Sequence, residues 1–148
     1  MSLTRRDNVC LSAGGLAIGT TTQKAKTVNA LTYTINGRTY TKAATDDLFT
    51  LSGTTSAARQ TCVFWLWLDS SGTASVTQSD IKEASTSTST TARHSPGAFE
   101  WPDVVDKCCV GALHVTNGAS SFVPGTTALT TVTTYINAGP EMGLPIAY

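Results

Sequence analysis

The chain has 148 residues, of which 41% are hydrophobic and 14% charged, with ten basic residues balanced against ten acidic ones. A chain of this length fits one domain that buries roughly 70% of the surface of its unfolded form. No apolar run approaches the ~20 residues that a transmembrane helix requires. Because phosphate binding draws on a surplus of basic residues, the balanced charge argues against nucleic acid as the main partner.

Threonine and serine occupy the share of the composition that leucine, glutamate and lysine take in most globular proteins. Threonine is β-branched, so it loses side-chain freedom in a helix and packs well on a pleated sheet. Strong helix formers cluster only around residues 80–84, where we expect at most one helical turn. The composition therefore predicts an all-β fold.

Residues 1–30 show no sustained hydrophobic period and are polar and spotted with glycine. We expect an extended N-terminal arm that lies on the protein's own surface or on a neighbour, or else a frayed terminus. The apolar stretch 9–19 is short and broken by Gly14 and Gly15, so we do not expect a signal peptide.

The first clear element is a hairpin over residues 31–42, in which Asn36-Gly37 separates two alternating runs. This dipeptide is the strongest short-range hairpin signal, because a type I′ turn needs positive φ at both central residues. A two-residue loop places Tyr33 opposite Tyr40. Tyr33, Ile35 and Tyr40 then share one face and four threonines share the other, so one face is predicted to be core and the other to face solvent or a polar partner.

Further short strands separated by turn signals follow along the chain. Residues 62–68 are apolar on both faces, which is typical of a fully buried strand, and residues 73–77 return as the paired strand. A Ser/Thr-only loop is expected over 85–91, and strands are expected at 110–115 and 131–136. The pattern predicts a β-sandwich, of the jelly-roll type, over residues 31–138, followed by a second extended arm over 139–148.

The four cysteines are Cys10, Cys62, Cys108 and Cys109. Cys62 and Cys109 lie in apolar runs, where a free cysteine behaves as a small buried hydrophobe, so we expect free thiols and folding in a reducing cytoplasm. Two disulfides are the alternative. A zinc site made by Cys108, Cys109 and His114 is disfavoured, because adjacent residues of a strand point to opposite faces. That alternation places Cys109 with Val115 and Cys108 with His114.

No catalytic motif occurs in the chain. Only His94 and His114 could serve as imidazole bases, and His94 falls in a Ser/Thr-rich loop region where a site would be hard to hold rigid. We therefore expect no enzyme activity, no cofactor and no metal. Trp65, Trp67 and Trp101 could form a sugar-stacking platform, but Trp65 and Trp67 lie in the most apolar strand and are expected to be core.

Two stretches resemble small proteins of tailed bacteriophages that act as capsid cement, decoration or head-fibre proteins. They are residues 29–49, NALTYTINGRTYTKAATDDLF, and residues 109–140, CVGALHVTNGASSFVPGTTALTTVTTYINAGP. The resemblance covers about a third of the chain, and no catalytic motif accompanies it. It implies a jelly roll or related sandwich that binds the outside of an icosahedral shell, often as a dimer or trimer.

We accordingly expect a structural virion protein, made in the host cytoplasm, that decorates the capsid exterior and bridges major capsid proteins. The alternative is a head-fibre or tail component that binds a host receptor or glycan. Neither role needs a membrane or nucleic acid. The apolar residues of the two arms are the expected partner contacts, since extended segments can order on binding; they are Leu11, Leu16, Ile18, Leu144, Ile146 and Tyr148.

Overall fold

The structure is a computed structural model, and it describes residues 8–83, 104–130 and 133–138. Every regular element in these residues is a β-strand, so the fold is all-β as predicted, and no helix that could cross a membrane occurs among them. The strands are β1 (Leu16–Ile18), β2 (Lys24–Thr27), β3 (Leu31–Ile35), β4 (Arg38–Lys42), β5 (Phe49–Thr50), β6 (Gln60–Asp69), β7 (Ala74–Gln78), β8 (Lys82–Glu83), β9 (Lys107–Thr116) and β10 (Thr133–Asn137).

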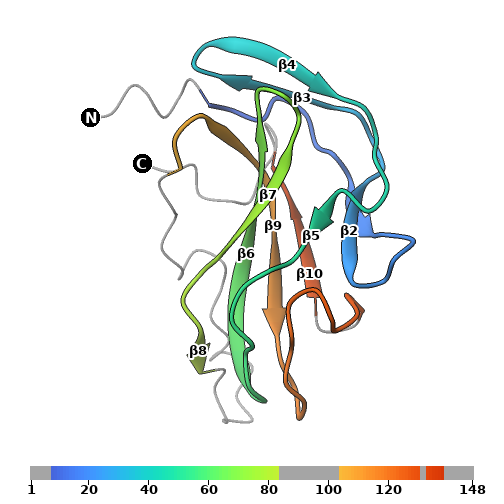
Figure 1. Cartoon of the computed structure of the whole chain (residues 1–148), viewed down its shortest axis with the longest axis vertical. Helices are drawn as coiled ribbons and strands as arrows, with labels where there is room; N and C mark the ends of the chain where they lie inside the picture. The colour runs from blue at the N-terminus through green and yellow to red at the C-terminus, as the bar shows by residue number, and fades with distance from the viewer. Residues whose placement is uncertain (1–7, 84–103, 131–132, 139–148) are drawn as a thin grey trace.

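The largest sheet has the strand order β10-β9-β6-β7. The two-residue strand β8 pairs with the start of β6, along the same edge of β6 that pairs with β7 further on. All of its pairings are antiparallel, and the two ten-residue strands β6 and β9 lie side by side at its centre. In Figure 1 these two strands form the long axis of the molecule. The predicted strands at 62–68, 73–77, 110–115 and 131–136 are confirmed as β6, β7, β9 and β10. Residues 131–132 of the last one lie outside the described residues.

Two smaller sheets accompany the large one. Strands β1, β2 and β5 form a three-stranded antiparallel sheet, and β3 pairs with β4 in the predicted hairpin. The register is the one predicted from Asn36-Gly37, with Tyr33 opposite Tyr40 and Ile35 opposite Arg38. Asn36 has φ 50° and Gly37 φ 78°, as a type I′ turn requires. Figure 1 shows this hairpin running across one end of the long strands.

One apolar cluster joins the small sheets to the large sheet, so the described strands form two layers around a core. Buried side chains of the hairpin, such as Tyr33, lie in the same cluster as Phe64 and Leu66 of β6 and Val110 of β9. The Tyr33 hydroxyl donates a hydrogen bond to the Asp69 carbonyl oxygen (2.8 Å), which fixes the hairpin to the end of β6. The sheet packing agrees with a β-sandwich, and the jelly-roll arrangement stays a prediction.

The expectation of an extended arm over residues 1–30 is wrong for the part that the structure describes. Leu16–Ile18 and Lys24–Thr27 pair with each other as β1 and β2, and Leu16 is buried in the core. The Leu16 amide also donates to Oδ1 of Asn137 at the end of β10 (2.7 Å). These strands are too short to give a sequence period, but they belong to the domain. The expected C-terminal arm, 139–148, lies outside the described residues.

The prediction of a helical turn around residues 80–84 is also wrong for residues 80–83, which the structure describes. Lys82 and Glu83 form β8, which pairs with Thr61 and Gln60 at the start of β6. The Gln60 side chain also donates to the Glu83 carboxylate (2.9 Å). A long-range pairing thus overrides the local helix preference of these residues.

Strand β9 contains a β-bulge that changes the faces of its residues. The register between β6 and β9 shifts between Leu66 and Trp67, which pair with Gly111 and Cys109 and so leave Val110 as the extra residue. Cys108 therefore lies in the core together with Val115, and Cys109 packs on the opposite face. The prediction that Cys109 shares a face with Val115 is wrong, because one extra residue reverses the alternation beyond it.

Candidate binding surfaces

The expected partner contacts of the N-terminal segment divide into one exposed and two packed residues. Leu11 is 44% exposed. Leu16 is buried in the core and Ile18 packs against it, so these two stabilise the domain itself. The remaining expected contacts, Leu144, Ile146 and Tyr148, lie outside the described residues.

Leu11 belongs to a short extended segment that adds a third chain to the β3–β4 sheet. Cys10 pairs antiparallel with Tyr33 in an isolated bridge. The Val9 amide donates to the Thr34 carbonyl (3.2 Å), the Thr34 amide to the Val9 carbonyl (2.8 Å), and the Leu11 amide to the Thr32 carbonyl (2.8 Å). Cys10 and Tyr33 are both buried, so Val9 and Leu11 face outward beside Thr34 and Thr32.

The outward side of this sheet is a surface of uncharged, mainly β-branched side chains, which we call the threonine face. Thr32 and Thr34 are half-buried, Thr39 and Thr41 are exposed, and Val9 is 39% exposed. The cross-strand pairs Thr32–Thr41 and Thr34–Thr39 set the threonines opposite one another. The face comprises Val9, Leu11, Thr32, Thr34, Thr39 and Thr41.

Most hydroxyl groups of the threonine face make no hydrogen bond to the described residues. The Thr34 hydroxyl donates to the Val9 carbonyl (3.3 Å) and so holds the edge segment. The hydroxyls of Thr32, Thr39 and Thr41 make no hydrogen bond to other described residues, which leaves them free to donate and accept. The sequence predicted the threonine side of the hairpin, but it gave no sign that Val9 and Leu11 lie beside it.

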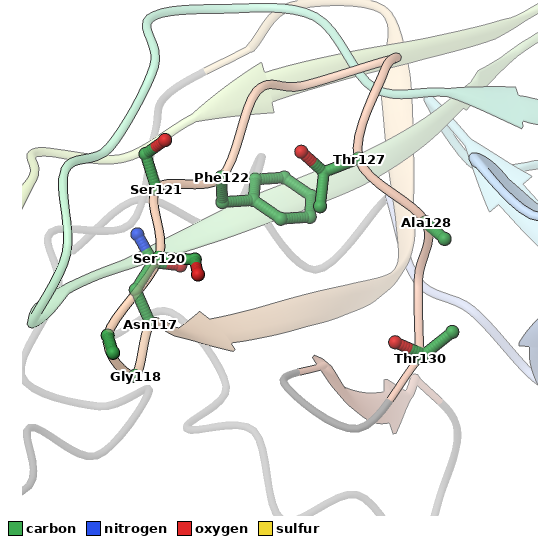
Figure 2. A pocket seen from close by; sticks show the side chains of 9 residues that line it. Asn117, Gly118, Ser120, Ser121, Phe122, Thr127, Ala128 and Thr130 are labelled. Atoms are coloured by element: carbon green, nitrogen blue, oxygen red, sulfur yellow. The ribbon is translucent and has the colours of Figure 1, made fainter.

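A cavity of about 210 Å³ lies in the loop that follows β9 (Figure 2). The Asn117 side chain at its edge is buried and donates to the carbonyl oxygens of Ser56 (3.0 Å) and Ala57 (2.7 Å) and to the Ser56 hydroxyl (2.8 Å). Phe122 is buried, and its ring lies 6.0 Å from that of Phe64. The Asn117 amide is thus used to attach the loop after β9 to the segment around Ser56 and Ala57. We therefore assign Asn117 a structural role and do not propose a ligand for this cavity.

A second cavity, of about 400 Å³, lies where the hairpin tip meets two turns of the large sheet. Its lining residues come from the hairpin, from the β6–β7 turn and from the turn before β9; they are Ile35, Asn36, Arg38, Tyr40, Ser70 and Asp106. Asn36 Nδ2 donates to Asp106 Oδ1 (2.8 Å), and the Asn36 amide donates to Asn8 Oδ1 (2.8 Å). The rim of this cavity is therefore tied together by hydrogen bonds between segments far apart in the sequence.

All four cysteines are free thiols in the structure. Burial raises the pKa of the Cys10, Cys62 and Cys108 thiols above the ordinary value, and it raises the pKa of Cys109 to about 12. The thiolate is the form that attacks substrates and binds metals. At neutral pH these cysteines are thus protonated and behave as core residues.

His114 lies on β9 with its Nε2 atom 2.9 Å from the Thr61 hydroxyl oxygen. The same hydroxyl lies 3.0 Å from the Val115 carbonyl oxygen and 3.2 Å from the Thr116 hydroxyl oxygen, so the imidazole belongs to a local hydrogen-bond network between β6 and β9. Thr61 is 1% exposed, so its hydroxyl is shielded from any substrate in solvent. His94 lies outside the described residues.

The two tryptophans of β6 are core residues, as predicted. Trp65 is 1% exposed and Trp67 is 4% exposed, and they form a cluster with Val63 and Ala112 on the second face of the large sheet. Rings buried to this degree offer no face to a sugar, so the stacking platform expected as an alternative is absent from β6. Trp101 lies outside the described residues.

Metal ligands do not converge within residues 8–83, 104–130 and 133–138, where no group of three or more His, Cys, Asp or Glu side chains could hold an ion. Cys108 and Cys109 lie on opposite faces of β9, which separates the two thiols of the disfavoured zinc site. Comparisons with family models, with curated proteins and with solved structures gave no match.

Proposed function

We propose that this protein is a structural virion component that decorates the exterior of a tailed-phage capsid and docks on the major capsid protein through its threonine face. The observation that carries the proposal is the exposure of Val9 and Leu11 on the same sheet face as the exposed Thr39 and Thr41. Exposed apolar side chains gathered on a sheet are typical of protein contact surfaces.

The chemistry of the threonine face suits a rigid protein contact. Valine and threonine side chains are restricted at χ1, so ordering them in an interface costs little conformational entropy. The face carries no charged side chain, so docking requires no desolvation of an ion. Both properties favour a contact that depends on shape and apolar area more than on charge.

The threonine face comprises the six residues named above, whereas a standard interface involves about 20–30 residues and buries about 800 Å² on each partner. A single contact of this size is weak. On a capsid lattice, however, contacts made through linked copies gain effective concentration from their neighbours. Self-association into a dimer or trimer, which is part of the proposal, would link two or three such faces and bridge neighbouring capsid subunits.

The copy number in purified virions tests this function, measured by quantitative mass spectrometry against the major capsid protein. Decoration of the shell requires a copy number of the same order as that of the capsid protein. Absence from the virion would contradict the proposal. A copy number that matches one tail or one vertex would contradict decoration and favour the receptor-binding alternative.

A further inference from the structure

We propose that the cavity at the hairpin tip is a binding site for a neutral saccharide. It is lined by residues of the hairpin, by Ser70 and by Asp106, and its volume of about 400 Å³ falls within the ~300–1,000 Å³ of small-molecule sites. The site is separate from the threonine face, and the inference does not rest on the capsid role.

Apart from the hydrogen bond between Asn36 and Asp106, the polar side chains that line this cavity are exposed or half-buried and keep donors and acceptors that no other described residue uses. The Arg38 guanidinium, the Tyr40 hydroxyl and the Ser70 hydroxyl make no hydrogen bond to other described residues, and no ion pair joins Arg38 to Asp106. Asp106 uses Oδ1 to accept from Asn36, which leaves Oδ2 available as an acceptor. The cavity is thus surrounded by hydrogen-bond donors and acceptors that remain available to a ligand.

The frame that carries these groups is preorganised. Asn36 and Asp106 both have positive φ (50° and 58°), and the hydrogen bond between their side chains fixes the two turns together. Asn8 bridges the same region, since Oδ1 accepts from the Asn36 amide and Nδ2 donates to the Lys107 carbonyl (3.1 Å). A frame held in this way loses little freedom when a ligand binds.

The arrangement of charge and ring favours a neutral, polyhydroxylated ligand. One cation, Arg38, and one anion, Asp106, give the lining no net charge, so neither an anionic nor a cationic ligand is favoured overall. A sugar hydroxyl both donates and accepts, so it can meet the guanidinium and the free carboxylate oxygen at once. Tyr40 adds an aromatic ring, which stacks on Tyr33 at a centroid distance of 5.9 Å and is thereby held in place.

A saccharide site of this kind would suit a virion protein that touches a host surface, which is the alternative role expected from the sequence. A site lined by six residues offers one sugar unit few contacts and binds it weakly, and repeated copies on a particle would raise the avidity. The site therefore adds a recognition function to a protein whose other surface is proposed to dock on the shell.

The test is titration of the isotope-labelled full chain with maltose, cellobiose and lactose, each raised to millimolar concentration and followed by amide chemical shifts. We expect at least one disaccharide to shift the amides of Asn36, Arg38 and Asp106. Arg38→Ala and Asp106→Asn should each weaken binding by about tenfold, which corresponds to about 1.4 kcal/mol. Asparagine tolerates positive φ and can still accept from Asn36, so Asp106→Asn changes the charge without straining the turn.

The matched control is Lys42→Ala, which removes a positive charge from the same side of β4 but does not line the cavity. It should bind as the parent does. No shift with any of the three sugars, or equal binding by the parent, Arg38→Ala and Asp106→Asn, would overturn the proposal. Neither result would bear on the copy number in virions, so the two proposals fail independently.

Discussion

Strand β6 and the β3–β4 hairpin are both antiparallel β-structure, yet they leave very different surfaces. Thr61 to Leu68 of β6 are buried on both faces of the large sheet. In β3, buried residues alternate with half-buried threonines, and only one face joins the core. The difference follows from the side chains. A strand that is apolar at every position must be buried on both faces of its sheet, whereas an alternating strand buries one face and leaves the other available to a partner.

Removal of residues 1–20 should have the largest effect, because it deletes β1 and the edge segment that pairs with β3. Leu16 and Cys10 would leave the core, and β2 would lose one of its two partner strands. We expect the truncated chain not to fold, as judged by loss of a cooperative thermal transition that the full-length chain shows. A truncated chain that melts like the full-length protein would restore the idea of a detachable arm.

Replacing Trp65 by alanine tests the claim that β6 is core. The ring is 1% exposed and packs with Val63, Trp67 and Ala112, so its removal should lower the free energy of unfolding by about 3–5 kcal/mol. Val105→Ala is the matched control, since Val105 is 77% exposed and should change stability by less than about 0.5 kcal/mol. Denaturant unfolding measures both, and equal stabilities would refute the core assignment.

Gly111→Ala tests the close packing of β1 and β10 on β9, next to the bulge. A Cβ atom at this position would lie 2.6 Å from the Ile136 carbonyl oxygen and would also meet the Leu16 side chain. We expect a loss of about 1–3 kcal/mol in unfolding free energy, typical of overpacking. Gly118→Ala, where nothing lies within 4 Å of the added atom, should stay near the parent. If the two variants are equally stable, the close packing of β1 and β10 on β9 is wrong.

The buried thiols predict a smaller effect that depends on pH. Burial raises the pKa of Cys109 from the ordinary 9.0 to about 12, so the folded state favours the protonated thiol. Its contribution to stability is complete below pH 9 and is lost as the pH rises toward 12. The melting temperature should therefore fall above pH 9. Cys109→Ser should retain less of this dependence, and identical pH profiles for the two proteins would contradict the assignment.

Local chemistry explains which parts of the fold could be predicted from the sequence. The hairpin register depends on Asn36-Gly37 and the adjacent alternation, so it was predicted residue by residue. The buried strand β6 was visible as a continuous apolar run. In both cases the signal lies within a few neighbouring residues.

The errors concern features that distant segments decide. Strand β1 is three residues long and gives no period, and β8 exists because Lys82 and Glu83 pair with the start of β6. The bulge at Val110 depends on the register between β6 and β9, which no local pattern reveals. The threonine face was half predicted, because its threonines alternate in the hairpin while Val9 and Leu11 reach it only through the Cys10–Tyr33 pairing.

The most direct measurement of the central claim is co-sedimentation of Thr39→Glu and Thr50→Glu proteins with purified heads that lack this protein. Both threonines are exposed on strands, but only Thr39 lies on the threonine face, and Thr50 pairs opposite Lys24 in another sheet. Each substitution should change the unfolding free energy by less than about 0.5 kcal/mol. A carboxylate buried without a partner in an interface costs several kcal/mol, so Thr39→Glu should lose binding while Thr50→Glu binds as the parent does. Full binding by a folded Thr39→Glu protein would contradict the claim that this face docks on the capsid.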